Sequence, residues 1–230
     1  QHKKRVAVVA VDPTSPFNYG SLLGDRLRLS AFFNHPDVYI RSLGSRGSLG
    51  GLSEKIIEIT DILRQCNFDY IFVETVGVGQ SEVEVAGLAD TTIVVFVPES
   101  GDEIQTMKSG IMEIADIFVV NKCDREGADR FAANLNHLIS RKVNDGENIP
   151  VVKTSALNKS GIDELMHQIE KQSSVEPVNP KKIFLLTEKA YRLIQKERMK
   201  AYPKTKIGEA INKQISEAGF NLYRFVKSMA

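Results

Sequence analysis

Two short polar segments of this sequence have the composition of a purine-base site. NKCD at 121–124 follows the apolar run 117–120, and TSAL at 154–157 follows the strand-like run 150–153. An ionised carboxylate can accept two hydrogen bonds side by side. Asp124 could therefore accept from both the N1–H and the amino group of guanine, a donor pair that adenine does not offer. The segments 121–124 and 154–157 are separated by one helix and one strand. This spacing favours a guanine site over the alternative of two ordinary surface turns.

The other residues of these segments have supporting roles in the predicted base site. Asn121 could brace its loop, and the aliphatic stem of Lys122 could lie over the base plane. A backbone N–H of the second segment could donate to the guanine carbonyl. The predicted base-binding residues are Asn121, Lys122, Asp124, Ser155, Ala156 and Leu157.

Three carboxylates, Asp12, Asp25 and Glu74, occupy positions suited to a magnesium ion and an attacking water. Mg²⁺ prefers oxygen ligands and keeps several waters, so carboxylates are expected near it. Glycines at 77 and 79 would let backbone N–H groups approach a phosphate. The alternatives are a salt bridge between Asp25 and Arg28, a turn cap at Asp12 and a solvated Glu74.

These residues belong to a chain in which strand patterns alternate with helical patterns. Continuous apolar runs are typical of buried parallel strands, and ligands of open α/β sheets bind beyond the carboxyl ends of the strands. We predict strands at 4–11, 38–40, 70–73, 92–97, 117–120 and 150–153. We predict helices at 21–33, 53–63, 81–88 and 128–140, one helix that ends at about residue 114 and one that ends at about residue 170. This order predicts an α/β fold with a doubly wound, mostly parallel sheet.

The last fifty residues show helical patterns without strand patterns. Residues 172–180 have linker composition, and amphipathic patterns on both sides of Pro203, with Gly219 as a weak point, predict a helical hairpin. The hairpin would either pack onto its own sheet or serve as a dimerisation arm or partner-binding surface. We therefore expect domains at 1–171 and 172–230.

Composition excludes several function classes. The formal net charge is +1, so no overall field attracts nucleic acid or an anionic membrane. No apolar run approaches the roughly 20 residues of a membrane span. The cysteines at 66 and 123 match no metal or redox spacing, which fits a reducing compartment. We expect neither a nucleic-acid nor a membrane partner.

Six separated motifs occur in a fixed order along the chain. They are VDPTSP at 11–16, LLGDRLRL at 22–29, SRGSLGGLS at 45–53, VETVGVGQSE at 73–82, GDEIQTMKSG at 101–110 and NKCD at 121–124. Together they resemble the MeaB/ArgK family of SIMIBI-class P-loop GTPases, which includes the human methylmalonic aciduria type A protein. The resemblance covers about 4–171 and is looser over 172–230, where the family has a helical dimerisation extension.

The resemblance implies a GTP-hydrolysing chaperone of an adenosylcobalamin-dependent acyl-CoA mutase such as methylmalonyl-CoA mutase. Such a chaperone gates cofactor loading and protects the mutase. The cofactors implied are GTP or GDP and Mg²⁺, and the protein would be a homodimer in the cytoplasm or, in a eukaryote, in the mitochondrial matrix. By similarity the catalytic residues are Asp25, Glu74, Gly77 and Gln80, the metal-binding residues are Asp12, Asp25 and Glu74, and a partner-sensing switch contains Asp102, Glu103, Gln105 and Lys108.

One family feature is absent from the sequence. A P-loop needs the motif G-x-x-x-x-G-K-[ST], and this chain has no Gly-Lys pair. In the family a strand, the P-loop and a helix precede the strand at Val6, so the expected fold is incomplete at its N-terminus. We expect weak nucleotide binding and no hydrolysis by this chain alone, with truncation of a longer protein as the simpler account. The alternatives are a non-catalytic scaffold with a degenerate nucleotide domain, or a GTPase or kinase linked to lysine, arginine and ornithine transport.

Overall fold

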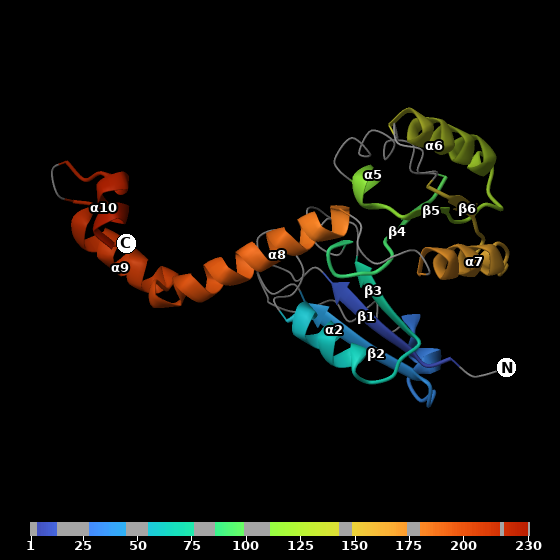
Figure 1. Ribbon diagram of the computed structural model, residues 1–230, viewed down its shortest axis with the longest axis horizontal. Helices are drawn as coiled ribbons and strands as arrows, with labels where there is room; N and C mark the ends of the chain where they lie inside the picture. Colours follow the sequence, from blue (N-terminus) through green and yellow to red (C-terminus); the bar gives the residue numbers. More distant parts are fainter. Residues whose placement is uncertain are drawn as a thin grey trace. The chain divides into compact units, whose positions relative to one another are not determined.

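The computed structural model describes residues 4–12, 28–44, 55–75, 86–98, 111–142, 149–173, 180–216 and 219–229. The chain divides into two compact units, residues 1–185 and residues 186–230 (Figure 1). This division falls inside helix α8 (Pro180–Arg198). The expected linker covers 172–180, of which 174–179 lie outside the described residues, so the domain boundary stays a prediction.

A first parallel sheet is built around a buried central strand. Strand β1 (Val6–Asp12) pairs with β2 (Val38–Gly44) on one side and with β3 (Tyr70–Thr75) on the other. Helix α2 (Ile56–Arg64) covers one face, because its apolar side chains recur at helical spacing and pack against alternate residues of β1. Val9 at the centre of β1 is fully buried.

A second parallel sheet has helices on both faces. Its strands are β4 (Ile93–Phe96), β5 (Ile117–Val120) and β6 (Val151–Lys153), with β5 in the middle. Side chains alternate between the two faces of a strand. Phe118 and Val120 therefore pack towards α6 (Ala128–Lys142), and Ile117 and Val119 towards α7 (Ile162–Ser173).

This arrangement confirms the predicted doubly wound α/β fold. Among the described residues, the two sheets have the orders β2-β1-β3 and β4-β5-β6, and β3 does not pair with β4. The interruption agrees with the expectation of an incomplete P-loop fold.

Some elements differ in length from their sequence patterns. Strand β2 continues four residues past the predicted end at Ile40, because Arg41 to Gly44 stay in register with β1 as far as Asp12. The helix predicted at 21–33 is described only from Arg28, where a short 3-10 turn, η1 (Ser30–Phe32), follows. Helix α5 (Ile111–Ile114) is the described end of the helix predicted before residue 114.

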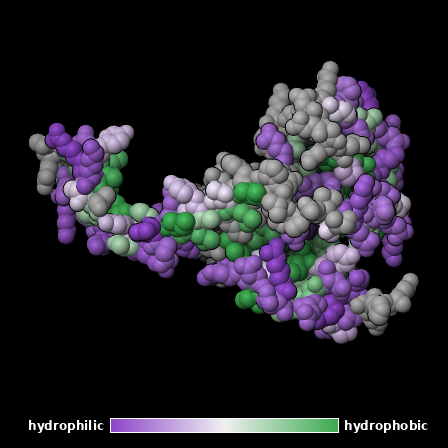
Figure 2. Space-filling view, viewed as in Figure 1, coloured by the Kyte–Doolittle hydropathy of each residue, from purple (hydrophilic) through white to green (hydrophobic). Residues whose placement is uncertain are grey.

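The second unit contains helices that leave many apolar side chains exposed. After α8 come η2 (Met199–Ala201), α9 (Lys204–Gln214) and α10 (Leu222–Met229). The break at Pro203 is confirmed, but a second break divides the predicted second helix, because Gly219 has a φ of +92° and Asn221 caps α10 by accepting from the N–H of Tyr223. Figure 2 shows hydrophobic residues along α8. The side chains of Tyr191 and Ile194 in this helix are exposed.

None of the helices in the described ranges combines the length and apolar character needed to cross a membrane.

An ion pair ties the start of β1 to the residue before β3. A carboxylate oxygen of Asp69 accepts from the N–H of Arg5 at 2.7 Å, and the other accepts from Lys4 Nζ at 3.3 Å. The backbone hydrogen bond from Arg5, followed by the bond from Lys4, holds the pKa of Asp69 below its ordinary value of 3.8.

A pH-dependent loss of stability is therefore expected for Asp69→Asn. A carboxyl whose pKa is lowered by folding stabilises the fold above its unfolded pKa, and this contribution disappears as pH falls through the folded value. We expect a slightly lower melting temperature than that of the unmodified chain at pH 7, and no difference once the carboxyl is protonated in both the folded and the unfolded state. Thermal melts between pH 2 and pH 7 measure this, and a deficit that persists unchanged at the acid end would contradict it.

Candidate guanine-base site

Two loops leave adjacent parallel strands at the same edge of the second sheet. Residues 121–125 follow β5, and residues 154–161 follow β6, which pairs with β5. The backbone also joins the loops directly, because the N–H of Cys123 donates to the carbonyl of Thr154 at 2.9 Å. The two predicted base-binding segments are thus brought together by the sheet itself.

Asn121 fastens the two loops through its side chain. Its Oδ1 accepts from the N–H of Ala156 at 3.1 Å and from the hydroxyl of Thr154 at 3.2 Å. Its own N–H donates to the carbonyl of Phe96 at 2.8 Å, which connects the loop to the end of β4. Asn121 therefore joins its loop to the ends of β4 and β6, contacts that the predicted bracing role would require.

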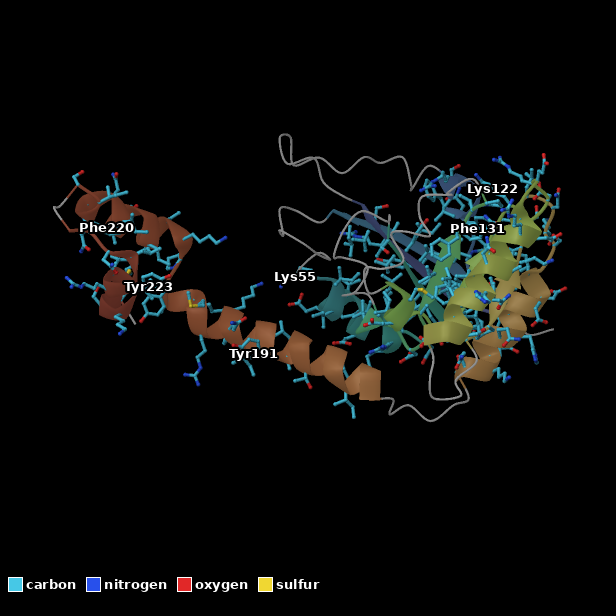
Figure 3. The ribbon with its side chains drawn as sticks, turned by 90° about the horizontal axis from the view of Figure 1, so that it is seen from above. Lys55, Lys122, Phe131, Tyr191, Phe220 and Tyr223 are labelled. Carbon is cyan, nitrogen blue, oxygen red and sulfur yellow. The ribbon has the colours of Figure 1, made fainter. Side chains whose placement is uncertain are left out.

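Lys122 adopts a backbone conformation that L residues rarely use. Its φ is +58°, in the left-handed region, which costs a non-glycine residue about 1–2 kcal/mol. Such a conformation persists where the surrounding structure enforces it. Here the residues on either side, Asn121 and Cys123, are both held by hydrogen bonds to the loop after β6. Lys122 lies at the end of β5 (Figure 3) and is half-buried, whereas Asp124 two residues on is exposed.

The second loop is a tight turn closed on itself. Ser155 and Ser160 exchange two backbone hydrogen bonds, at 3.0 and 3.2 Å. At the end of the turn, Gly161 has a φ of +73°, and a Cβ added there would lie 2.0 Å from the carbonyl oxygen of Lys153. Only glycine fits this crossing of two backbones.

The backbone donors of this turn are already partly used. The N–H of Ser155 donates to Ser160 and that of Ala156 to Asn121. Leu157, the other predicted base-binding residue of this turn, is 90% exposed. Ser155 is buried, and its Oγ has no hydrogen-bond partner among the described residues. A buried hydroxyl without a partner is costly, and the Oγ of Ser155 is the buried side-chain atom of this turn that lacks one among the described residues.

These features fit a guanine base. Asp124 is exposed and would offer two acceptor oxygens to the N1–H and amino donors, and the contacts of Asn121 hold the loop that carries it. The roles of Asn121, Lys122, Asp124, Ser155, Ala156 and Leu157 in binding stay predictions.

The predicted acidic site lies at the end of the first sheet. Asp12 is the last residue of β1, and Glu74, an exposed residue near the end of β3, is in register with Ala10. The carboxyl ends of parallel strands meet at one edge, so the backbone places Asp12 and Glu74 at the same end of this sheet. The remaining catalytic, metal-binding and partner-sensing predictions lie outside the described residues: Asp25, Gly77, Gln80, Asp102, Glu103, Gln105 and Lys108.

Two residues that shape the candidate base site were not predicted from the sequence. Thr154 is buried and donates its hydroxyl to Asn121, and Gly161 permits the close crossing beneath the turn. A glycine directly before a helical pattern was the only available signal for Gly161. The hydroxyl of Thr154 contacts Asn121, which follows a different strand, so no local sequence pattern predicts this contact.

An exposed ion pair lies beside the turn. Lys153 Nζ donates to Asp129 Oδ1 at 2.7 Å, which lowers the pKa of Asp129 and raises that of Lys153, the hydrogen bond being the main cause and the charge attraction the second. Both side chains are exposed, so this pair contributes little to stability.

A moderate loss of stability is expected for Thr154→Val. Valine keeps the β-branched shape but cannot donate to Asn121 Oδ1, so one partly buried hydrogen bond is lost, worth about 1 kcal/mol. The N–H of Ala156 still holds Asn121, so the loop should keep its conformation. Urea unfolding measures the change, and Thr154→Ser, which keeps the hydroxyl, is the control that should recover most of it. Equal losses in both variants would contradict the role of the hydroxyl.

Comparison with known proteins gives a consistent result. Residues 1–196 match the family described as methylmalonyl Co-A mutase-associated GTPase MeaB. A protein of Pyrococcus horikoshii named as a GTPase is 48% identical over 169 residues, 72% of this chain and 53% of that protein. GTPase ArgK of Escherichia coli is 41% identical over 172 residues, 72% of this chain and 51% of that protein.

A mitochondrial relative and one solved structure are more limited matches. The methylmalonic aciduria type A homolog of Caenorhabditis elegans is 43% identical over 121 residues, 53% of this chain and 30% of that protein. HypB from Helicobacter pylori has a TM-score of 0.49 and 15% identity, over 75% of this chain and 79% of that chain, which is too weak to indicate a shared function. The chain spans about half the length of the Pyrococcus horikoshii and Escherichia coli relatives.

Proposed function

Because the chain belongs to the family of methylmalonyl Co-A mutase-associated GTPases MeaB, we propose that it is the base-recognising part of a GTP-hydrolysing chaperone for an adenosylcobalamin-dependent acyl-CoA mutase. Such a chaperone would gate loading of the mutase with its cofactor and protect the mutase. The observation that carries the proposal is the fastening of two strand-end loops by Asn121 beside the exposed Asp124.

In this proposal the base is held by the residues of the second sheet. Asp124 accepts from the N1–H and amino group of guanine, and the stem of Lys122 covers one face of the ring. The hydroxyl of Ser155 gains a partner when the site is filled, which offsets the cost of burying it. Ala156 acts mainly by holding Asn121, and Leu157 lies at the rim.

The phosphates and metal would lie at the end of the first sheet. Carboxylate oxygens suit Mg²⁺, so Asp12 and Glu74 are proposed to hold it, directly or through its waters. When bound, the ion would neutralise charge on the phosphates. Asp25, Gly77 and Gln80 are assigned to the attacking water and the γ-phosphate on the resemblance alone.

The proposed partners are a mutase and a second copy of the chain. The family description and the name of the C. elegans relative support a methylmalonyl-CoA mutase as the client. Asp102, Glu103, Gln105 and Lys108 are proposed to sense it. The exposed apolar residues of α8 and α10 support a dimerisation arm, since Tyr191, Ile194 and Leu222 are each more than half exposed.

Calorimetric titration with GDP and GTP tests the proposal. The chain of residues 1–230 would be compared with a longer form extended upstream to include a P-loop. We expect micromolar or tighter binding by the longer form and much weaker binding by residues 1–230, because the backbone cradle for the phosphates supplies much of the affinity. Tight binding by the short chain would contradict the assigned phosphate site, and no binding by either form would favour a non-catalytic scaffold.

A further inference from the structure

Charge is divided unevenly between the two units of the chain. Residues 186–230 contain ten lysines and arginines but four glutamates, a formal charge of +6, although the whole chain carries only +1. Residues 1–185 therefore carry a formal charge of −5. The expectation that no anionic membrane attracts this protein depends on the net charge of the whole chain, so it does not extend to the second unit. A charge asymmetry of this kind indicates an anionic partner for the basic half.

The described cations of the second unit lie at its surface. Among the side chains that the structure describes in this unit, the only exposed carboxylates are those of Glu197 and Glu209, and Glu197 is paired with Lys200 at 2.7 Å. Eight lysine and arginine side chains are described there, and all are exposed: Lys196, Arg198, Lys200, Lys204, Lys206, Lys213, Arg224 and Lys227. The described surface of this unit is thus positively charged.

Helix α10 presents exposed apolar side chains next to some of these cations. Its Phe225 is buried and packs on Phe220, with ring centroids 6.1 Å apart, so this side of the helix faces its own unit. Tyr223 (Figure 3) and Val226 are instead 81% and 54% exposed, and the exposed Lys227 follows directly. Residues three and four apart lie on one side of a helix, and we call Tyr223, Val226 and Lys227 the α10 face. The helix contains two basic residues and no acidic one.

This composition fits the interface of an anionic membrane better than it fits nucleic acid. Amphipathic helices that lie on such membranes combine lysines with apolar and aromatic side chains, and the apolar side enters the headgroup layer. Tyrosine suits this layer because its ring is apolar and its hydroxyl stays hydrated. The phosphates of a nucleic acid would pair with the cations but would leave Val226 in water.

We propose that residues 186–230 dock on the surface of an anionic lipid bilayer, with the α10 face inserted among the headgroups. The helices lie on this membrane and do not cross it. The cations of α9, among them Lys206 and Lys213, strengthen the attraction, because each lysine near an anionic surface raises the affinity about fivefold. Tyr191 and Ile194 of α8 stay assigned to the proposed dimerisation arm, and the docking does not depend on nucleotide binding.

Cosedimentation of the whole chain with lipid vesicles tests the proposal. Vesicles of phosphatidylcholine with about one third phosphatidylglycerol are compared with vesicles of phosphatidylcholine alone. We expect the anionic vesicles to bind the chain at least about tenfold more tightly than the neutral ones, because the cations and the apolar side chains then act together. We also expect this binding to fall steeply towards about 1 M salt, where charges are screened within about 3 Å.

Two kinds of variant separate the apolar and the electrostatic parts of this interaction. Val226→Asp should weaken binding to the anionic vesicles about tenfold or more, since it replaces an inserting side chain with a negative charge. Reversal of two exposed cations of α9, Lys206→Glu with Lys213→Glu, should weaken it by about the same factor. The matched control is Lys55→Glu with Lys171→Glu, which makes the same change in net charge at exposed positions of the first unit and should leave binding unchanged.

A single tryptophan locates the contact with lipid, because the sequence contains none. In Tyr223→Trp the emission should shift to shorter wavelength on addition of anionic vesicles, as the indole enters the headgroup layer. Tyr39→Trp, at a 41% exposed position of β2, is the control and should show no shift.

Equal binding to both kinds of vesicle, or binding to neither, would overturn the proposal. An equal loss of binding in the first-unit control would overturn the assignment to the second unit. A tryptophan emission at position 223 that shifts without vesicles, and more so as the chain concentration rises, would overturn the proposal and give the α10 face to a second copy. Capture of a mixed-sequence RNA without binding to anionic vesicles would overturn it in favour of a nucleic-acid partner.

Discussion

Replacing Asp124 with asparagine is expected to weaken guanine-nucleotide binding about 100-fold or more and to favour xanthine nucleotides. Hydrogen bonds to a charged group contribute about 1.5–3 kcal/mol each, and about 1.4 kcal/mol corresponds to a factor of ten. An amide has an N–H₂ group in place of the second carboxylate oxygen, so it cannot accept both guanine donors side by side. Its N–H₂ group can instead donate to the carbonyl that xanthine carries in place of the amino group.

Calorimetry with GDP and xanthosine diphosphate on the longer, P-loop-containing form measures this reversal. The matched control is Asp129→Asn, because Asp129 is another exposed aspartate close to the turn but pairs with Lys153. That variant should keep the guanine preference of the unmodified protein. An unchanged ratio of the two affinities in Asp124→Asn would remove Asp124 from the base site.

The central strands could be predicted because their signals are local. Uninterrupted apolar runs define β1, β4 and β5, and each strand lies within one or two residues of its predicted bounds. The neighbouring positions of the two candidate segments could be predicted for a related reason. Adjacent parallel strands end at the same edge, so the order of strand, helix and strand was enough to place NKCD beside TSAL.

The contacts that join the two candidate loops were not available from sequence patterns. Asn121 reaches Ala156 and Thr154 across the gap between two strand ends, and this depends on the register of β5 and β6. The length of β2 is a similar case, since pairing with β1 rather than its own composition extends it to Gly44. The break between α9 and α10 follows from the left-handed conformation of Gly219 and from the helix cap at Asn221. In the sequence, Gly219 alone was only a weak sign of this break.

Gly161→Ala is expected to lower the free energy of unfolding by about 3 kcal/mol and to abolish base binding. The left-handed φ of +73° costs an alanine about 1–2 kcal/mol, and relief of the contact with the carbonyl of Lys153 adds about 1–3 kcal/mol. The carbonyl of Gly161 also accepts the first helical bond of α7, from the N–H of Leu165. A shift of Gly161 would therefore disturb both the turn that carries Ser155 and the start of a core helix.

Two other glycines separate the causes of this loss, and urea unfolding measures all three variants. Gly127 has a φ of +85°, and a Cβ added there would meet no atom within 4 Å, so Gly127→Ala should show the conformational cost alone. Gly208 lies inside α9 with the same open surroundings, so Gly208→Ala should stabilise its helix by up to about 1 kcal/mol. If Gly161→Ala lost no more stability than Gly127→Ala, the backbone crossing would not be what requires glycine at 161. In the longer, P-loop-containing form, full loss of GDP binding in Gly161→Ala, with binding kept in Gly127→Ala, would show that the crossing positions the base loop as well as stabilising it.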